Sequence, residues 1–397
     1  MVFLLDQTQT FLASLVVFFL GSLIHARFYG LRKFNIPEPV IGGILVALVF
    51  TFVRHQFEIQ IVRDMGVQNQ LMYAFFATVG LSARFSLFKN GGKAIFTFLS
   101  VAVFYLVIQN LIGVSVASMV GLDPRFGLLA GSITLSGGHA TGASYAAQFH
   151  HLEGAVEIAL ACATFGLVLG GIIGGPVSQW LIARNDLAPS DKVNDPDECL
   201  KGHGFNEPEL VTTWSTFQVL FLCLLAMVSG DLLSKFVHFE RILVPEFIWI
   251  LFSAIFWTNI AALHPKTQLQ DQSIELVNMI SLSLFLSLAM MGLDLMELVN
   301  LALPVLAIVI VQVVALVIFT TQVTFRLLGK DYDAAVIVSG HCGFGLGATP
   351  TALANMESIT NRYGAAPSAI FVVLMVGAFF IDIANALVIQ GFLGWVG

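Results

Sequence analysis

Charged side chains are scarce in this sequence. Of its 397 residues only 11% are Asp, Glu, Lys or Arg, whereas 57% are hydrophobic. Soluble globular domains carry about 25% charged residues, so this composition argues against a water-soluble fold and for lipid as the solvent. The formal net charge of −7 also argues against nucleic acid as a partner.

Cysteine and enzyme motifs are scarce as well. The four cysteines have neither CxxC nor metal-ligand spacing, which argues against a disulfide framework and a zinc site. Buried cysteine acting as a small apolar residue is the simpler interpretation. HExxH, GxSxG and ATP-binding motifs are absent from the sequence. We therefore expect neither an enzyme nor an ATP-driven pump, and no cofactor.

No basic residue precedes the first apolar window, as a cleaved secretory signal would require. Asp6 stands there instead, and Arg27, Arg32 and Lys33 follow the window. Basic residues favour the cytoplasmic side of a membrane, so we expect the N-terminus outside. If the spans then alternate, most of the 18 Lys and Arg residues are cytoplasmic, both termini are periplasmic and the central loop is cytoplasmic.

Long apolar windows recur from end to end of the chain, and a helix needs about 20 such residues to cross a bilayer. The windows lie near 11–24, 39–53, 71–82, 94–117, 155–183, 211–229, 243–262, 276–292, 301–323 and 367–395. The second window is short and starts in IPEP, which leaves its boundary open. Together the windows predict an all-α integral membrane protein with about ten transmembrane helices.

The two halves of the chain resemble each other. Pro37-Glu38 matches Pro245-Glu246, and GLDPRFGLLAGSITLSGGHATGAS from residue 121 matches GKDYDAAVIVSGHCGFGLGATPT from residue 329. Hydropathy does not dictate these shared Gly, Pro and Asp residues. Each half has about five windows, an odd number, so the second half must cross the membrane in the opposite direction. Inverted repeats with paired glycine-rich interruptions are typical of secondary transporters.

The repeat predicts three segments and two re-entrant loops. The segments are an N-terminal five-helix repeat (1–183, loop near 126–150), a cytoplasmic linker (184–210) and an inverted C-terminal repeat (211–397, loop near 334–360). The glycine-rich stretches LSGGHATGAS (135–144) and SGHCGFGLGATPT (339–351) lie in the loops. Non-helical backbone at membrane depth must be buried in protein or line an aqueous cavity. We therefore expect the two loop tips to meet inside the protein.

Several stretches of this chain are also motifs of a known family. They are IPEPVIGG, AFFATVGL, GLLAGSITLSGGHATGA, ACATFGLVLGG, GKDYDAAV, GHCGFGLGATPTA and MVGAFFIDIANALVI. Through them the chain, from about residue 36 to 390, resembles the bacterial sodium/glutamate symporter family. The resemblance implies Na⁺-coupled uptake of L-glutamate across the inner membrane. It also implies an elevator-type secondary transporter that forms a homodimer.

Glutamate has two carboxylates and one ammonium group, but no window centre contains Lys or Arg. We therefore expect loop amides, hydroxyl groups and co-bound Na⁺ to hold the carboxylates. The candidate substrate-binding residues in the loops are Ser136, Gly137, Gly138, Thr141, Gly345, Gly347, Thr349 and Thr351. For the Ser and Thr residues, hydrogen bonds back to the backbone are the alternative.

Asp382 lies in the middle of the last apolar window, where a carboxylate is costly and indicates a functional site. Asn385 follows at position i+3 and shares its helix face. Carboxylate and amide oxygens suit a hard cation, so we expect Asp382, Asn385, Thr141 and Thr349 to bind Na⁺. Alternatively, Asp382 accepts the ammonium group of the substrate or pairs with a polar residue of a neighbouring helix.

Other polar residues within the windows have two interpretations each. For Gln109, Asn110 and Gln312 we favour hydrogen bonds between helices. For His139 and His341 we favour hydrogen-bonded structural roles over a proton relay. Alternative functions are transport of another small carboxylate, coupling to H⁺, and an ion channel. Channel filters are usually built by subunits around an axis, so inverted halves favour a carrier.

Overall fold

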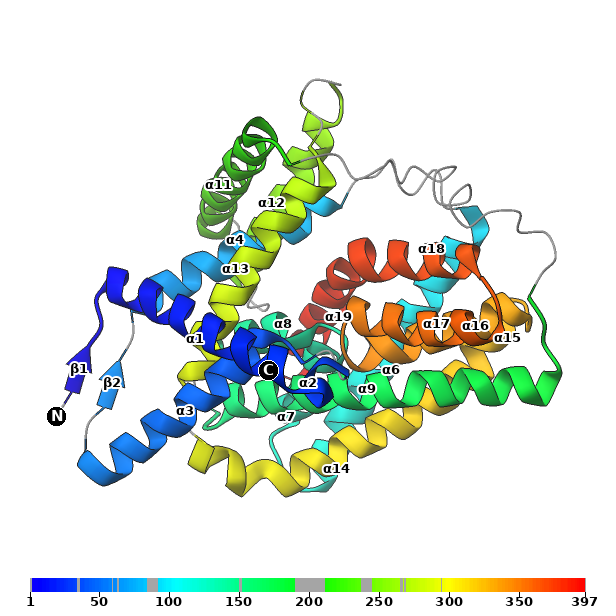
Figure 1. The fold of residues 1–397 in the computed structure, drawn as a ribbon, viewed down its shortest axis with the longest axis horizontal. Coiled ribbons are helices and arrows are strands. Elements are labelled where there is room, and N and C mark those ends of the chain that lie inside the picture. Colours follow the sequence, from blue (N-terminus) through cyan, green and yellow to red (C-terminus); the bar gives the residue numbers. More distant parts are fainter. Residues whose placement is uncertain are drawn as a thin grey trace. The chain divides into compact units, whose positions relative to one another are not determined.

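The computed structural model describes most of the chain. The described residues are 2–33, 36–58, 60–62, 64–83, 92–149, 152–189, 211–236, 245–264, 267, 269–293 and 295–396. Most of the expected linker 184–210, with Cys199, therefore lies outside the described residues. Helices make up nearly all of the described structure (Figure 1).

The first half of the chain forms a series of helices. They are α1 (Gln7–Arg27), α2 (Tyr29–Lys33), α3 (Glu38–Phe57), α4 (Met65–Ser82), α6 (Gly92–Met119), α7 (Pro124–Leu128), the π turn η1 (Leu129–Ile133), α8 (Gly138–Ala146) and α9 (Ala155–Asn185). The Asp6 side chain accepts a hydrogen bond from the backbone of Gln9 and so caps α1. Two three-residue strands, β1 (Val2–Leu4) and β2 (Gln60–Val62), pair in parallel.

The second half of the chain forms a second series of helices. They are α11 (Thr213–Phe236), α12 (Glu246–Ala261), α13 (Asp271–Met291), α14 (Leu295–Phe319), the π turn η3 (Thr320–Thr324), α15 (Phe325–Leu327), α16 (Tyr332–Leu346), α17 (Thr349–Tyr363), α18 (Pro367–Met375), the π turn η4 (Val376–Phe380) and α19 (Ile381–Val396). Matching residues have matching positions. Pro37 and Pro245 precede α3 and α12, and Asp123 and Asp331 cap α7 and α16.

The chain separates into two compact units, and each unit takes elements from both halves of the chain. Unit 1 comprises Met1–Arg84, Ala143–Leu160 and Leu210–Ala302, and unit 2 comprises Phe85–Gly142, Ala161–Glu209 and Leu303–Gly397. Unit 1 thus contains α1, α3 and α4 with α11, α12 and α13. Unit 2 contains both interruptions, with α6, α7, the first part of α8, most of α9 and α14, and the helices from α15 to the end of the chain.

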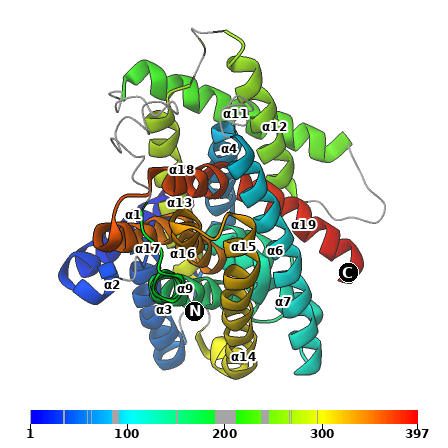
Figure 2. The same ribbon diagram turned by 90° about the vertical axis from the view of Figure 1, so that its right-hand side faces the viewer.

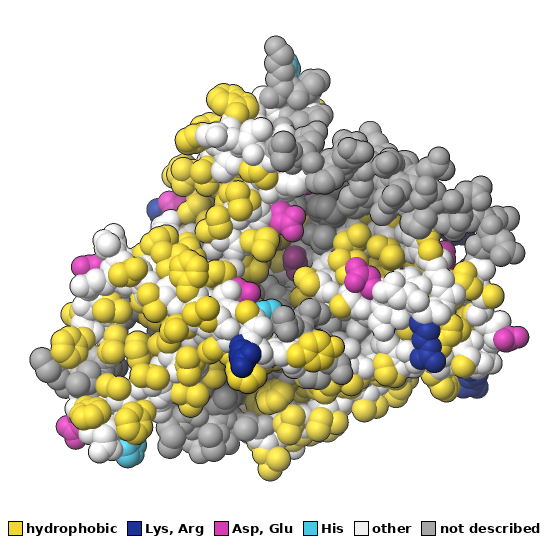
Figure 3. All heavy atoms as spheres, in the orientation of Figure 1, with side chains coloured by type: hydrophobic (Ala, Val, Ile, Leu, Met, Phe, Trp, Pro, Cys, Tyr) yellow, Lys and Arg dark blue, Asp and Glu magenta, His cyan; other side chains and the backbone are white. Residues whose placement is uncertain are grey.

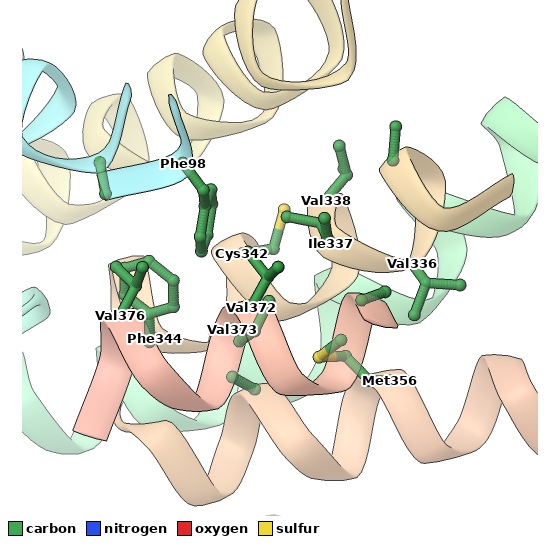
Figure 4. Packing of buried hydrophobic residues seen from close by; sticks show 14 of the residues in the cluster. Phe98, Val336, Ile337, Val338, Cys342, Phe344, Met356, Val372, Val373 and Val376 are labelled. Atoms are coloured by element: carbon green, nitrogen blue, oxygen red, sulfur yellow. The ribbon is translucent and has the colours of Figure 1, made fainter. Parts of the chain in front are cut away.

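Apolar side chains from several helices form the core of unit 2. Figure 4 shows Val338 and Phe344 of α16 packed with Val373 of α18 and Phe98 of α6. Lipid tails are as apolar as these side chains, so close packing stabilises such a core more than removal from water does. A smaller core in unit 1 joins α4, α11, α12 and α13.

Several helices have the length and composition of membrane spans. Among the described residues these are Gln7–Arg27, Glu38–Phe57, Lys93–Met119, Ala155–Asn185, Thr213–Phe236, Asp271–Met291 and Leu303–Leu327, with Glu246–Ala261 and Ile381–Val396 as shorter apolar helices. Apolar side chains cover much of the face in Figure 3, whereas Lys and Arg are few there. Apart from its small strand pair, the chain is an all-helical, multi-pass membrane protein.

The glycine-rich stretches are more helical than the sequence predicts. We expected loops over 135–144 and 339–351, but α8 begins at Gly138 and α16 continues to Leu346. Within the second stretch glycine permits close packing, since a Cβ on Gly343 would lie 2.4 Å from Cα of Ala352 in α17. The expectation that these two stretches are non-helical along their length was therefore wrong. The non-helical backbone is confined to short interruptions.

Candidate functional site

The first interruption lies between α7 and α8. Gly131, inside η1, has φ −108° and ψ −136°, which are not helical values. Gly138 has φ +70°, a conformation that glycine adopts readily. Ser136 and Gly137 form a turn that directly precedes Gly138, the first residue of α8. The sequence AGSITLSGG thus bends the chain twice within one short stretch.

The second interruption is the two-residue break at Gly347 and Ala348. Gly347 has φ −148° and ψ −96°, and Ala348 has φ −157° and ψ 163°. The flanking helices α16 and α17 lie side by side (Figures 1 and 2). Each has 15 residues and is about 22 Å long at 1.5 Å per residue. A hydrocarbon core is about 30 Å thick, so this hairpin has the dimensions of a re-entrant element.

The two interruptions are neighbours within unit 2. A Cβ built on Gly138 would lie 3.7 Å from the carbonyl oxygen of Gly347. Gln109 of α6 joins the two glycine-rich stretches. Its Nε2 donates to the carbonyl of Gly345 (2.9 Å), and its Oε1 accepts from the hydroxyl of Ser136 (2.7 Å). The expected meeting of the two tips is confirmed.

Further amide side chains brace the first interruption. Gln312 of α14 donates from Nε2 to the carbonyl of Gln109 (2.7 Å). Asn110 accepts at Oδ1 from the N–H of Ser132 (2.9 Å), and Asn385 of α19 donates from Nδ2 to the Ser132 carbonyl (2.9 Å). The hydrogen bonds between helices that we expected for Gln109, Asn110 and Gln312 are confirmed.

The helical segment α18–η4–α19 contacts both interruptions. A Cβ on Gly377 would lie 3.2 Å from Oγ1 of Thr349, the first residue of α17, whereas Asn385 binds Ser132 at the first interruption. Asp382 lies between these two contacts in the sequence and is partly exposed within the described structure. It forms no hydrogen bond or ion pair with another described residue, so its carboxylate is available to a ligand.

The remaining candidates also lie in unit 2. Thr141 and Thr349 are partly exposed and have hydroxyls without a hydrogen bond to any described residue. Thr351 is fully buried, and its Oγ1 has no partner in the part of the chain that the structure describes. His139 and His341 each form a 3.0 Å hydrogen bond to a threonine hydroxyl, and their structural role stays a prediction.

Sequence reasoning missed two polar residues of this region. Ser132 follows Gly131 in an otherwise apolar run, and its fully buried side chain gives no pattern that stands out. Asn355 of α17 donates from Nδ2 to the carbonyls of Gly170 (2.9 Å) and Ser339 (3.4 Å). The signal for Asn355 is an amide on the apolar face of a helix, which commonly bonds to a neighbouring helix in a membrane.

Helices that are broken inside an apolar unit, with polar groups gathered at the breaks, are typical of the class of secondary transporters. Comparison with known proteins identifies the family. The family model described as sodium/glutamate symporter matches residues 3–365. The sodium/glutamate symporter of Escherichia coli (strain K12) is 44% identical over 398 residues, 98% of either chain. That of Haemophilus influenzae is 41% identical over 386 residues, 96% of this chain and 95% of its own. The chain belongs to the sodium/glutamate symporter family.

One solved structure is also similar over nearly the whole chain. The sodium proton antiporter MjNhaP1 from Methanocaldococcus jannaschii matches 99% of this chain and 98% of its own, with 14% identity and a TM-score of 0.44. Family membership rests on the sequence matches.

Proposed function

We propose that this protein takes up L-glutamate together with Na⁺ across the bacterial inner membrane by alternating access. Its family supports this, since the relatives in Escherichia coli and Haemophilus influenzae are named sodium/glutamate symporters. In the structure, the supporting observation is that Gly138 and Gly347, at the two interruptions, lie against each other. Polar groups from both halves of the chain therefore meet at one place.

Substrate binding is proposed at the two interruptions. The residues are Ser136, Gly137, Gly138, Thr141, Gly345, Gly347, Thr349 and Thr351, together with Asp382. The first turn of α17 presents N–H groups without helical partners, which favour a carboxylate. The Ser136 hydroxyl and the Gly345 carbonyl are bound to Gln109, so we assign these two residues a part in shaping the site.

Cation binding is proposed for Asp382, Asn385, Thr141 and Thr349. Bringing an anionic substrate out of water is costly, and the window centres contain no Lys or Arg to offset its charge. A co-bound Na⁺ would offset it, which gives a physical reason for coupling. Asp382 accepting the substrate ammonium group is the alternative role for that residue.

The wider architecture is also a proposal. It comprises about ten transmembrane helices in inverted repeats, 1–183 and 211–397, with re-entrant elements, a cytoplasmic linker at 184–210 and both termini in the periplasm. We propose an elevator-type homodimer in which unit 2, which contains every candidate residue, is the carrier domain. Labelling of single cysteines at both termini and in the linker from either side of the membrane tests the orientation.

Uptake into proteoliposomes tests the function directly. An inward Na⁺ gradient should drive accumulation of labelled L-glutamate, and replacing Na⁺ by choline should abolish it. Counterflow with labelled amino and hydroxy acids, in Na⁺ or in choline at several pH values, tests another carboxylate cargo or H⁺ coupling. Uptake that is unchanged in choline would refute Na⁺ coupling, and single-channel currents would favour a channel.

A further inference from the structure

Three fully buried side chains at the first interruption have polar atoms without partners. Asn110, Ser132 and Asn385 are exposed by 0%, 0% and 1%. Nδ2 of Asn110, Oγ of Ser132 and Oδ1 of Asn385 have no hydrogen-bond partner anywhere in the described part of the chain. An unpaired buried polar group costs about 1–3 kcal/mol, so three such atoms around one residue require a physical explanation.

The three side chains converge on Ser132. Its N–H donates to Oδ1 of Asn110 (2.9 Å), and its carbonyl accepts from Nδ2 of Asn385 (2.9 Å). These partners determine the orientation of both amides, which leaves the oxygen of Asn385 and the nitrogen of Asn110 unpaired. Gly131 permits this approach, because a Cβ there would lie 2.8 Å from Oδ1 of Asn110.

The unpaired oxygens suit a small cation. Hydroxyl and amide oxygens are ligands of hard cations, and Ser132 and Asn385 supply one of each. A partly dehydrated ion is a ligand small enough to reach side chains that are buried this completely. Asp382 lies at i−3 from Asn385 in the same helix and supplies negative charge on a nearby part of that helix.

We propose that Ser132 and Asn385 bind a partly dehydrated Na⁺ at the first interruption, and that Asn110 is the positioning residue that holds Ser132 in place. The inference rests on the proposed Na⁺-coupled function and adds Ser132 and Asn110 to the proposed ion site. Asn110 Nδ2 is a donor and cannot ligate a cation. It donates to a water that completes the coordination of the ion.

The competing explanation is a single structural water that satisfies the same atoms. The two explanations differ in how removal of the Ser132 hydroxyl acts. If no ion binds, Ser132→Ala removes a poorly satisfied polar group and changes stability equally with and without Na⁺. If Na⁺ binds, the variant loses stabilisation that depends on Na⁺ concentration, because a ligand stabilises the state that binds it.

The experiment is heat unfolding of the full-length protein in detergent, titrated with NaCl against choline chloride at constant ionic strength. For wild type we expect the Tm to rise with Na⁺. For Ser132→Ala and for Asn385→Ala, the Na⁺ concentration at half-maximal effect should increase at least about tenfold, equivalent to 1.4 kcal/mol. Without Na⁺, Ser132→Ala should unfold at or above the wild-type Tm.

Ser178→Ala is the matched control. Ser178 is also fully buried in unit 2, but its hydroxyl donates to the Ala335 carbonyl (2.7 Å). We expect its Tm to fall equally with and without Na⁺, and its titration midpoint to stay at the wild-type value. If Ser132→Ala has the same Na⁺ titration midpoint as wild type, the proposed ion site is wrong and the unpaired atoms bind a structural water only. Wild-type uptake that does not need Na⁺ overturns the proposed function, which is a separate result.

Discussion

The two interrupted helices have matching sequences but different structures. The first is bent by non-helical values at Gly131 and a positive φ at Gly138, and amide side chains from α6 and α19 brace it. The second stays helical up to a two-residue break. Close packing holds it together, since Gly343 in α16 lies against Ala352 in α17.

This difference shows two distinct uses of glycine in one protein. At the first interruption glycine permits a backbone conformation that other residues rarely adopt. In the second hairpin it removes a side chain so that two helices can approach. The first interruption therefore depends on polar partners from distant elements, whereas the second depends on the fit of its own two helices. We therefore expect Na⁺ binding to affect the conformation of the first interruption more than that of the second.

The largest expected effect is that of Asp382→Asn, which tests whether both interruptions serve one site. The substitution keeps the shape of the side chain but removes the charge between the contacts to Thr349 and Ser132. Asp382 has no partner among the described residues, so the substitution removes the proposed contact with the ligand. A contact to a charged group contributes up to about 3 kcal/mol, so Na⁺-dependent glutamate uptake should fall about a hundredfold. Uptake in proteoliposomes measures this. Asp382→Glu is the charge-retaining control, and normal uptake by folded Asp382→Asn would remove Asp382 from the site.

The next effect concerns the bridge between the interruptions. Gln109→Met leaves the Ser136 hydroxyl and the Gly345 carbonyl without their partner, at about 1–3 kcal/mol for each group. The Tm should fall clearly, and substrate affinity should weaken because the two tips are no longer held together. Gln322→Met, at an exposed position of η3, is the matched control. Equal Tm values for both variants would contradict the bridge.

Smaller effects are expected from Thr141→Ala and Thr349→Ala, which change equivalent positions of the two interruptions. A hydrogen bond to a charged group contributes about 1.5–3 kcal/mol, so each loss should raise the apparent constant for glutamate or Na⁺ roughly tenfold or more. Uptake kinetics measure both constants. Thr→Ser variants should restore them. If only one of the two Thr→Ala variants raises an apparent constant, ligand binding is restricted to the interruption that contains the changed threonine.

The smallest effect is expected at the caps of the two interrupted helices. Asp123 accepts from the N–H of Arg125 (2.9 Å), and Asp331 accepts from the N–H of Ala334 (2.8 Å). Replacement of either by Ala should cost about 1 kcal/mol in unfolding free energy. The hydrogen bond from the Arg125 side chain lowers the pKa of the Asp123 carboxyl below its usual 3.8.

That lowered pKa gives the Asp123 cap a defined pH dependence. A carboxyl whose pKa is lower in the folded protein stabilises it above the unfolded-state pKa, and this contribution is lost as pH falls through the folded-state pKa. The Tm difference between wild type and Asp123→Ala should therefore be present at neutral pH and shrink in strong acid. Heat unfolding from neutral pH to pH 3 measures it. A difference that stays constant would show that the charge of Asp123 contributes nothing.

Much of the helical framework could be predicted from the sequence. The window near 94–117 lies within α6 and the window near 155–183 within α9, because backbone in lipid must satisfy its own hydrogen bonds and a long apolar helix does so within one segment. The cysteines that the structure describes, Cys162, Cys223 and Cys342, are buried, as predicted. The extent of the loops was mispredicted because a glycine that packs a helix and a glycine that breaks one look alike in sequence.

The candidate site could be predicted only in part. The glycine-rich stretches and the amides of α6 stand out in an apolar chain, and the structure brings them together. Ser132 does not stand out, and its amide partners, Asn110 and Asn385, are 22 and 253 residues away in the sequence. The order of residues near Ser132 contains no information about these two hydrogen bonds, because the packing of helices distant in sequence decides them.

The sequence by itself determined that the chain is a helical membrane protein, because long apolar windows are a local property. Tertiary structure alone decided that helices of the two halves join in the same unit, and which backbone groups Gln109, Asn110 and Asn385 bind. The physical reason is that a buried amide binds whichever unsatisfied group the packing of helices places within about 3 Å.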